Sequence, residues 1–161
     1  MAVLLCVAVF AGSFLIAGAA IRARADRTTV TAWVICQPGD YVNARTRATK
    51  SSAAVGMYET GDAVELDGKT SNGYAHIVDA GLEVSEAWIH TGYIVFDEPE
   101  WVGDEMTVVG NGRVAARKYA EGPVRTWLKP FSYVQVFWMT EDWAVTNRGF
   151  IKTEYLEVGT L

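Results

Sequence analysis

The chain has 161 residues, of which 50% are hydrophobic and 12% aromatic, and its formal net charge is −5. This content supports one ordinary core or two small ones and excludes a disordered chain. The negative balance excludes a nucleic-acid binder that works by bulk electrostatics, because phosphate recognition needs clustered Lys and Arg.

The first 20 residues carry no charged side chain and are mostly apolar or small. A run of this length can cross the hydrocarbon of a bilayer as a helix. Ala-x-Ala steps at 17–19 and 23–25 are typical of a signal-peptide cleavage site. We therefore predict that residues 1–25 form a signal peptide, with a retained membrane anchor as the alternative and a buried core helix ranked last. If the segment is not cleaved, it is the only membrane contact that we expect.

The basic residues around this segment favour a different location for the rest of the chain. Arg22, Arg24 and Arg27 follow the apolar run and no basic residue precedes it. By the positive-inside rule this order would keep the rest of the chain in the cytoplasm. We rank that orientation lower and expect an extracytoplasmic protein, secreted or anchored at the cell envelope. Cleavage after Ala25 would lower the net charge to −7, which disfavours polyanionic wall polymers unless a local basic patch binds them.

Of the two cysteines, Cys6 lies in the apolar run and Cys36 lies in AWVICQ. A processed chain would keep Cys36 alone, so no intrachain disulfide is expected. Because AWVICQ is typical of a strand, we predict a buried and unreactive Cys36 thiol.

After the leader, short alternating runs are broken by Gly, Asn, Asp and Pro, which is typical of a small all-β fold. These runs repeat in order. YVNAR (41–45) matches RVAAR (113–117), GDAVELD (61–67) matches FSYVQVF (131–137), Tyr74 matches Trp143, and AWIHTGYIV (87–95) matches GFIKTEYLE (149–157). The offset falls from 72 to 62 because the first copy carries an extra DAGLEVSE in its last hairpin, where insertions are tolerated.

We therefore predict two barrel-sized units of about five short strands each, at 34–96 and 106–158. The acidic stretch 97–105 between them is predicted to be a linker, in which Trp101 packs against a neighbour.

The order V-N-A-R, G-D-x-V-x-L, N-G-Y and W-I-H-T-G-Y-I resembles the bacterial SH3-like (SH3b) domain family. The second unit resembles it through Val114, Arg117, Gly122-Pro123, Val134, Val136, Trp143, Gly149-Phe150-Ile151 and Tyr155-Leu156. TRATKSS, Ala87 and Ala115 depart from the family pattern. The resemblance implies an all-β protein of two tandem SH3-like barrels after an N-terminal hydrophobic helix. It also implies a cell-wall peptide, such as a peptidoglycan stem peptide or cross-bridge, as the partner.

Arg45 and Arg117 stand at the same place in the two repeats, at the start of the long loop after the first matched strand. A planar guanidinium with several donors can hold loop carbonyls. We predict a structural role for both arginines, with direct ligand contact as the alternative.

Catalysis is not expected. The histidines available to a nucleophile such as Cys36 are His76 and His90, and Cys36 lacks the Asp-Cys-Ser helix start of NlpC-type hydrolases, which are often joined to SH3b domains. No Cys/His cluster at metal spacing, phosphate-binding Gly loop or H-E-x-x-H stands in the sequence. We therefore expect no metal and no cofactor.

One strand differs in character between the repeats. Val64 and Leu66 match Val134 and Val136, which marks the buried face, since alternate strand residues face opposite sides. On the other face the first unit has Ala63, Glu65 and Asp67, whereas the second has Phe131, Tyr133, Gln135 and Phe137. Such an aromatic face needs a cover. It is either a seam between the two units or a ligand site, for which the candidate residues are Tyr119, Trp127, Phe131, Tyr133, Phe137 and Trp138.

The sequence thus predicts a non-catalytic extracytoplasmic binding or targeting module that recognises a cell-wall peptide or an envelope protein, and no nucleic acid. The alternative is a structural protein–protein component of an envelope or secretion assembly.

Overall fold

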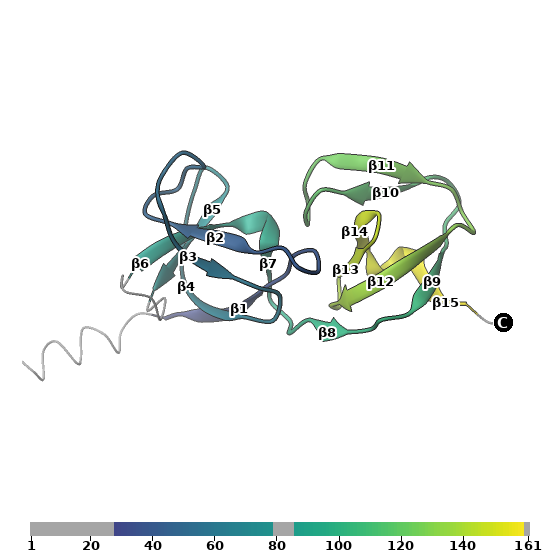
Figure 1. The fold of residues 1–161 in the computed structure, drawn as a ribbon, viewed down its shortest axis with the longest axis horizontal. Helices are drawn as coiled ribbons and strands as arrows, with labels where there is room; N and C mark the ends of the chain where they lie inside the picture. The colour runs from purple at the N-terminus through teal and green to yellow at the C-terminus, as the bar shows by residue number, and fades with distance from the viewer. Residues whose placement is uncertain (1–27, 79–85, 160–161) are drawn as a thin grey trace, which may run out of the picture.

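The computed structural model describes residues 28–78 and 86–159 (Figure 1). These residues are nearly all β and form two antiparallel sheets, which confirms the all-β prediction. The predicted leader, residues 1–25, lies outside the described residues. Within the described part of the chain, no helix is both long enough and apolar enough to cross a membrane.

The first sheet has the strand order β3-β2-β6-β5-β4-β1-β7. Its elements are β1 (Val30–Val34), β2 (Val42–Arg45), β3 (Ala54–Tyr58), β4 (Ala63–Ser71), β5 (Tyr74–Val78), β6 (Glu86–His90), the 3-10 helix η1 (Thr91–Tyr93) and β7 (Ile94–Val95). The first strand therefore begins before residue 34, where the sequence places the start of this unit.

The second sheet repeats this order as β11-β10-β14-β13-β12-β9-β15. Its elements are β8 (Glu100–Trp101), β9 (Glu105–Val108), β10 (Val114–Arg117), β11 (Val124–Leu128), β12 (Tyr133–Met139), β13 (Trp143–Thr146), β14 (Gly149–Lys152), the 3-10 helix η2 (Thr153–Tyr155) and β15 (Leu156–Val158). Part of the expected linker is thus strand, because β8 pairs with β12.

The two sheets also share their register. Arg45 pairs with Trp88 as Arg117 pairs with Phe150, and each arginine follows a register shift in its strand. Alternation explains the cores: Val64 and Leu66 are buried in one unit and Val134 and Val136 in the other. The sequence repeat therefore corresponds to a repeated topology.

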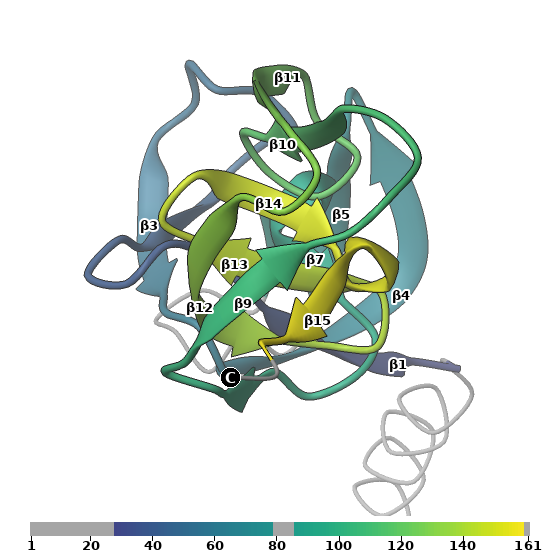
Figure 2. The same cartoon turned by 90° about the vertical axis from the view of Figure 1, so that its right-hand side faces the viewer.

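The predicted closed barrels need correction. Among the described strands, β3 does not pair with β7, nor β11 with β15, so each sheet is curved but open (Figure 2). The physical reason is strand length. The two residues of β7 both pair with β1, and the three residues of β15 all pair with β9.

The two units lie side by side, with β8 between them (Figure 1). Each has its own core, and a third buried cluster joins the units. We call it the seam cluster; its buried members are Ile35, Val95, Ala120, Trp143, Val145 and Phe150. The backbone N–H of Ala120 also donates a hydrogen bond of 3.0 Å to the carbonyl of Gly92. The units therefore share apolar burial and backbone pairing.

A buried carboxylate in the first unit makes stability depend on pH. Asp67 lies 2.7 Å from Lys69 Nζ and 3.0 Å from His76 Nδ1, and it also accepts a hydrogen bond from the backbone N–H of Lys69. Burial alone would raise the pKa of Asp67, but the hydrogen bonds from Lys69 and His76 outweigh it and lower this pKa to about 2. Because the ordinary value is 3.8, the carboxylate stabilises the fold above about pH 4 and loses that contribution as the pH falls toward about 2.

We expect Asp67→Asn to lower the free energy of unfolding at neutral pH by about 1–3 kcal/mol, because a charged hydrogen-bond acceptor is lost from a buried site. The same change should flatten the dependence of stability on pH between about 4 and 2. Urea unfolding across that range measures both effects. Asp142→Asn is the matched control, since Asp142 is exposed, and equal pH profiles for the two variants would contradict this account.

Candidate functional site: two equivalent grooves

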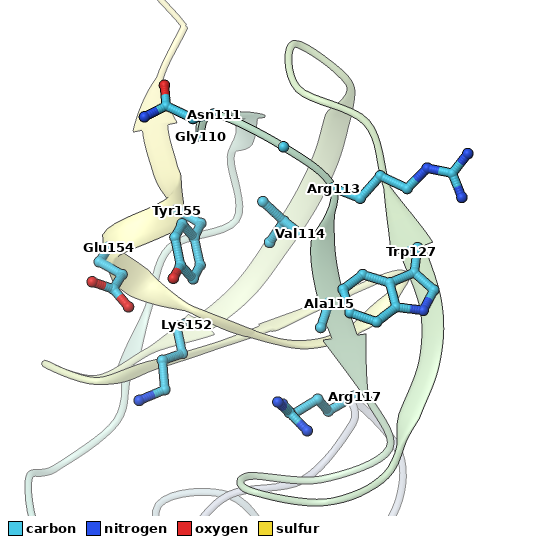
Figure 3. Close-up of a pocket in the computed structure, with 11 residues that line it drawn as sticks. Gly110, Asn111, Arg113, Val114, Ala115, Arg117, Trp127, Lys152, Glu154 and Tyr155 are labelled. Carbon is cyan, nitrogen blue, oxygen red and sulfur yellow. The ribbon is translucent and has the colours of Figure 1, made fainter.

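The second unit carries an open groove of about 600 Å³ between β10, β11 and η2 (Figure 3). Val114 and Ala115 of β10 form its floor. Trp127 of β11 and Tyr155 of η2 stand on opposite sides of Val114 and are 56% and 37% exposed. The groove therefore has an apolar floor between two accessible aromatic walls.

Charged side chains also line this groove, and Arg113 lies on its Trp127 side (Figure 3). Arg117 ends β10, Lys152 ends β14, and Glu154 lies in η2. Lys152 Nζ lies 5.5 Å from the centre of the Trp143 ring and 3.7 Å from an oxygen of Glu121. The groove therefore offers charged groups of both signs to a ligand.

The local sequence explains the walls. On β11 Leu128 packs against the core, so its neighbour Trp127 faces outward. Tyr155 is held by its carbonyl, which accepts a hydrogen bond of 2.9 Å from the N–H of Val109. The stretch Gly110-Asn111-Gly112 leaves the groove end open, and Gly110 has φ +148°, a conformation that favours glycine.

The first unit has the equivalent groove, which contributes to a cleft of about 500 Å³ at the seam. The matched lining residues are Val42, Asn43, Arg45, His90 and Tyr93 in place of Val114, Ala115, Arg117, Lys152 and Tyr155. Here the second unit also contributes to the lining, through Lys118, Tyr119, Arg125 and Phe150. We call this space the inter-unit cleft.

Tyr119 is the side chain that makes the two grooves differ. Its ring centre lies 4.8 Å from that of His90 and 5.4 Å from that of Tyr93. A Cβ on Gly92 would collide with the Tyr119 ring, whereas the matched position in the second unit holds the exposed Glu154. The neighbouring unit thus packs on the first groove, and the second groove stays open.

Burial sets the ionisation of the cleft residues. It lowers the pKa of His90, whose Nδ1 accepts a hydrogen bond of 3.1 Å from the N–H of Gly92. His90 is therefore a neutral imidazole with its proton on Nε2. Burial first, and the neighbouring Tyr119 and Asp40 next, raise the pKa of Tyr93.

Cys36 also lines the cleft and is buried there. It follows β1 and does not lie within a strand. Burial raises the pKa of its thiol, which accepts a hydrogen bond from Thr60 Oγ1 at 3.4 Å. A buried thiol that holds its proton is a weak nucleophile. In the described residues, no group of three or more His, Cys, Asp or Glu could hold a metal ion.

The two predicted loop arginines lie in the two grooves. Arg45 donates a hydrogen bond of 2.7 Å to the carbonyl of Ser52, and Arg117 donates one of 2.7 Å to the carbonyl of Gly122. Each guanidinium therefore holds the loop after its strand and also borders a groove.

The structure divides the predicted aromatic set into three places. Phe137, Trp138 and Tyr119 pack against the seam cluster. Trp127 lines the open groove, while Phe131 and Tyr133 are 78% and 64% exposed near the start of β12. The register of β12 against β13 shifts between Val136 and Trp138, so the strand does not keep one continuous aromatic face.

Trp101 packs against the seam end of that strand. Its ring centre lies 5.1 Å from that of Trp138 and 6.3 Å from that of Phe137.

Sequence reasoning did not select Tyr155, Lys152 and Glu154, nor Tyr74, His90 and Tyr93 of the cleft, as site residues. Their signal is the closing motif, WIHTGY in one repeat and FIKTEY in the other. Both copies end on a tyrosine that is the last residue of a 3-10 helix, and this tyrosine lines the groove in each unit.

The fold and the two grooves define a two-unit, all-β protein. No family model and no curated protein matches the chain. Two solved structures are similar to it, NlpC1 and NlpC2 from Trichomonas vaginalis, each with 16% sequence identity and a TM-score of 0.33. The alignments cover 83% of this chain and 47% and 49% of the other two. The chain therefore spans about half the length of each, and a similarity this low assigns no activity to it.

Proposed function

We propose that the chain is a non-catalytic binding module of two SH3-like units, in which the open groove of the second unit holds an extended peptide. The observation that carries the proposal is the pair of accessible rings, Trp127 and Tyr155, across the apolar floor at Val114 (Figure 3). Aromatic walls beside charged groups suit a short peptide, because the rings bury its apolar surface while the charged groups bind its polar ends.

The charged side chains of the groove support a peptide over a sugar. Arg117 and Lys152 can bind a carboxylate, and Glu154 can bind an ammonium group. A short peptide carries both groups, whereas a neutral glycan carries neither. With the resemblance to SH3b domains, this makes a cell-wall peptide the proposed ligand and the extracytoplasmic side of the envelope the proposed location.

Two observations support a role in binding rather than in catalysis. The cleft contains both Cys36 and His90, but Cys36 is a buried thiol with a raised pKa. His90 Nδ1 is already engaged by the N–H of Gly92. A nucleophile needs a thiolate or an adjacent free base, and neither residue is arranged for that role.

The test is a pull-down of the full chain with purified sacculi. We expect Trp127→Ala to weaken binding about tenfold or more, as expected for an aromatic hot spot. Phe131→Ala is the matched control, because it removes a more exposed aromatic ring outside the groove. No binding by the folded wild type would reject the wall ligand, and equal loss in both variants would reject the groove.

A structural role in an envelope or secretion assembly is the second candidate, and Phe131 and Tyr133 favour it. Both rings are largely exposed and neither lines the open groove. Exposed aromatic side chains, here one in the turn before β12 and one on its first residue, are typical of protein contacts. Loss of a co-purifying envelope protein in the Phe131→Ser, Tyr133→Ser double variant, with sacculus binding unchanged, would establish this role instead.

A further inference from the structure

We propose that the inter-unit cleft is a second binding site, selective for a short peptide that carries carboxylates. The lining side chains include four cations and a single carboxylate, Asp40; the cations are Arg45, Lys50, Lys118 and Arg125. The whole chain has a net charge of −5. A local excess of positive charge in an acidic protein attracts an anionic ligand to that place.

The described residues form no ion pair with the cations of the cleft. Among the described residues, the side chains of Lys50, Lys118 and Arg125 form no ion pair and no hydrogen bond. Arg45 donates one hydrogen bond to the carbonyl of Ser52, and this bond fixes its guanidinium beside the cleft. Unpaired like charges around one space repel one another, and a bound carboxylate removes that cost.

The wall of the cleft lacks one acceptor. The side-chain Nε2 of Gln37 is buried without a hydrogen-bond partner among the described residues, and Gln37 lines the cleft. A buried donor without an acceptor is unfavourable. A carboxylate or peptide carbonyl in the cleft supplies this acceptor when the Gln37 side chain turns toward it.

The aromatic residues of the cleft favour a peptide over a small inorganic anion as the ligand. The rings of Tyr74, Tyr93 and Tyr119 surround His90, with centres 5.3, 5.7 and 4.8 Å from that of its imidazole. Such a surface packs against an apolar stem while the cations bind its charged ends. The cleft volume, about 500 Å³, is in the range of sites for ligands of a few residues.

Both units contribute charges to this site. Arg45 and Lys50 belong to the first unit, whereas Lys118 and Arg125 belong to the second. A ligand that bridges them binds only when the units are docked, so it stabilises their arrangement through linkage. The site is independent of the open groove, because Trp127 does not line the cleft.

The test titrates the full chain with an N-acetylated Glu-Ala-Glu tripeptide and with the neutral Gln-Ala-Gln tripeptide, by calorimetry at low salt. We expect the acidic peptide to bind at least tenfold more tightly and to weaken as salt is raised. Lys118→Gln plus Arg125→Gln should reduce its affinity tenfold or more. Lys129→Gln plus Arg148→Gln is the matched control, since it removes the same charge from exposed positions outside the cleft.

Equal affinity for the two peptides would overturn the proposal, as would equal loss in the two double variants. Inorganic polyphosphate that displaces the acidic peptide at equal charge would also overturn it and indicate a general anion site. Trp127→Ala should leave tripeptide binding unchanged. If the chain does not bind sacculi but still binds the acidic tripeptide, the proposed function is rejected and the proposal for the cleft stands.

Discussion

Replacing Phe150 with alanine should lower the free energy of unfolding by about 3–5 kcal/mol, the usual cost of removing a large buried aromatic side chain. Phe150 is fully buried in the seam cluster, and its ring centre lies 6.3 Å from that of Tyr93 in the other unit. The cavity would open where the two units meet, so the change should weaken both the second sheet and its docking on the first.

Urea unfolding followed by tryptophan fluorescence measures this loss. Phe96→Ala is the control, because Phe96 is 69% exposed and its removal should change stability by less than about 0.5 kcal/mol. A loss below about 1 kcal/mol for Phe150→Ala would show that the seam cluster contributes little. Since Phe150 also lines the inter-unit cleft, the same variant should bind the acidic tripeptide more weakly.

The repeat in the sequence was sufficient to predict an all-β chain, although it indicated about five strands in each unit and the described residues form seven in the first and eight in the second. Val42 with Val114 and Arg45 with Arg117 occupy matching positions because local alternation and turn residues determine which strand residues face inward. The closed barrel could not be obtained in this way. Closure depends on whether strands far apart in the sequence are long enough to pair, and β7 has only two residues.

The candidate site was predictable only in part for a similar reason. Trp127 was selected from its residue type and lines the open groove. Phe137 packs at the seam, whereas Tyr133 of the same strand stays exposed. This difference depends on how the two units dock, and the local sequence carries little signal of docking. The matched positions 92 and 154 carry one such signal. Gly92 is required where Tyr119 packs closely, and Glu154 is tolerated where the groove stays open.

Replacing Gly149 with alanine should lower the free energy of unfolding by about 2–6 kcal/mol, because strained backbone and overpacking each cost about 1–3 kcal/mol. Gly149 has φ +127°, and a Cβ there would collide with the backbone carbonyl oxygen of Arg117. That oxygen belongs to β10, which pairs with β14 through Arg117 and Phe150, so relief of the collision requires the two strands to separate.

The first unit shows why the glycine is needed only in the second. Ala87 occupies the matched position, but the longer hairpin there pairs Ala87 with Ile77 inside the strand ladder. In the second unit Thr146 pairs with Gly149 across a tight turn, which forces the positive φ. Gly112→Ala is the control, since a Cβ at Gly112 has no neighbour within 4 Å, and it should change the urea midpoint little. Because strand separation also displaces Arg117 from the open groove, Gly149→Ala should lose sacculus binding along with stability; a stable variant with intact binding would contradict the close approach of β10 and β14.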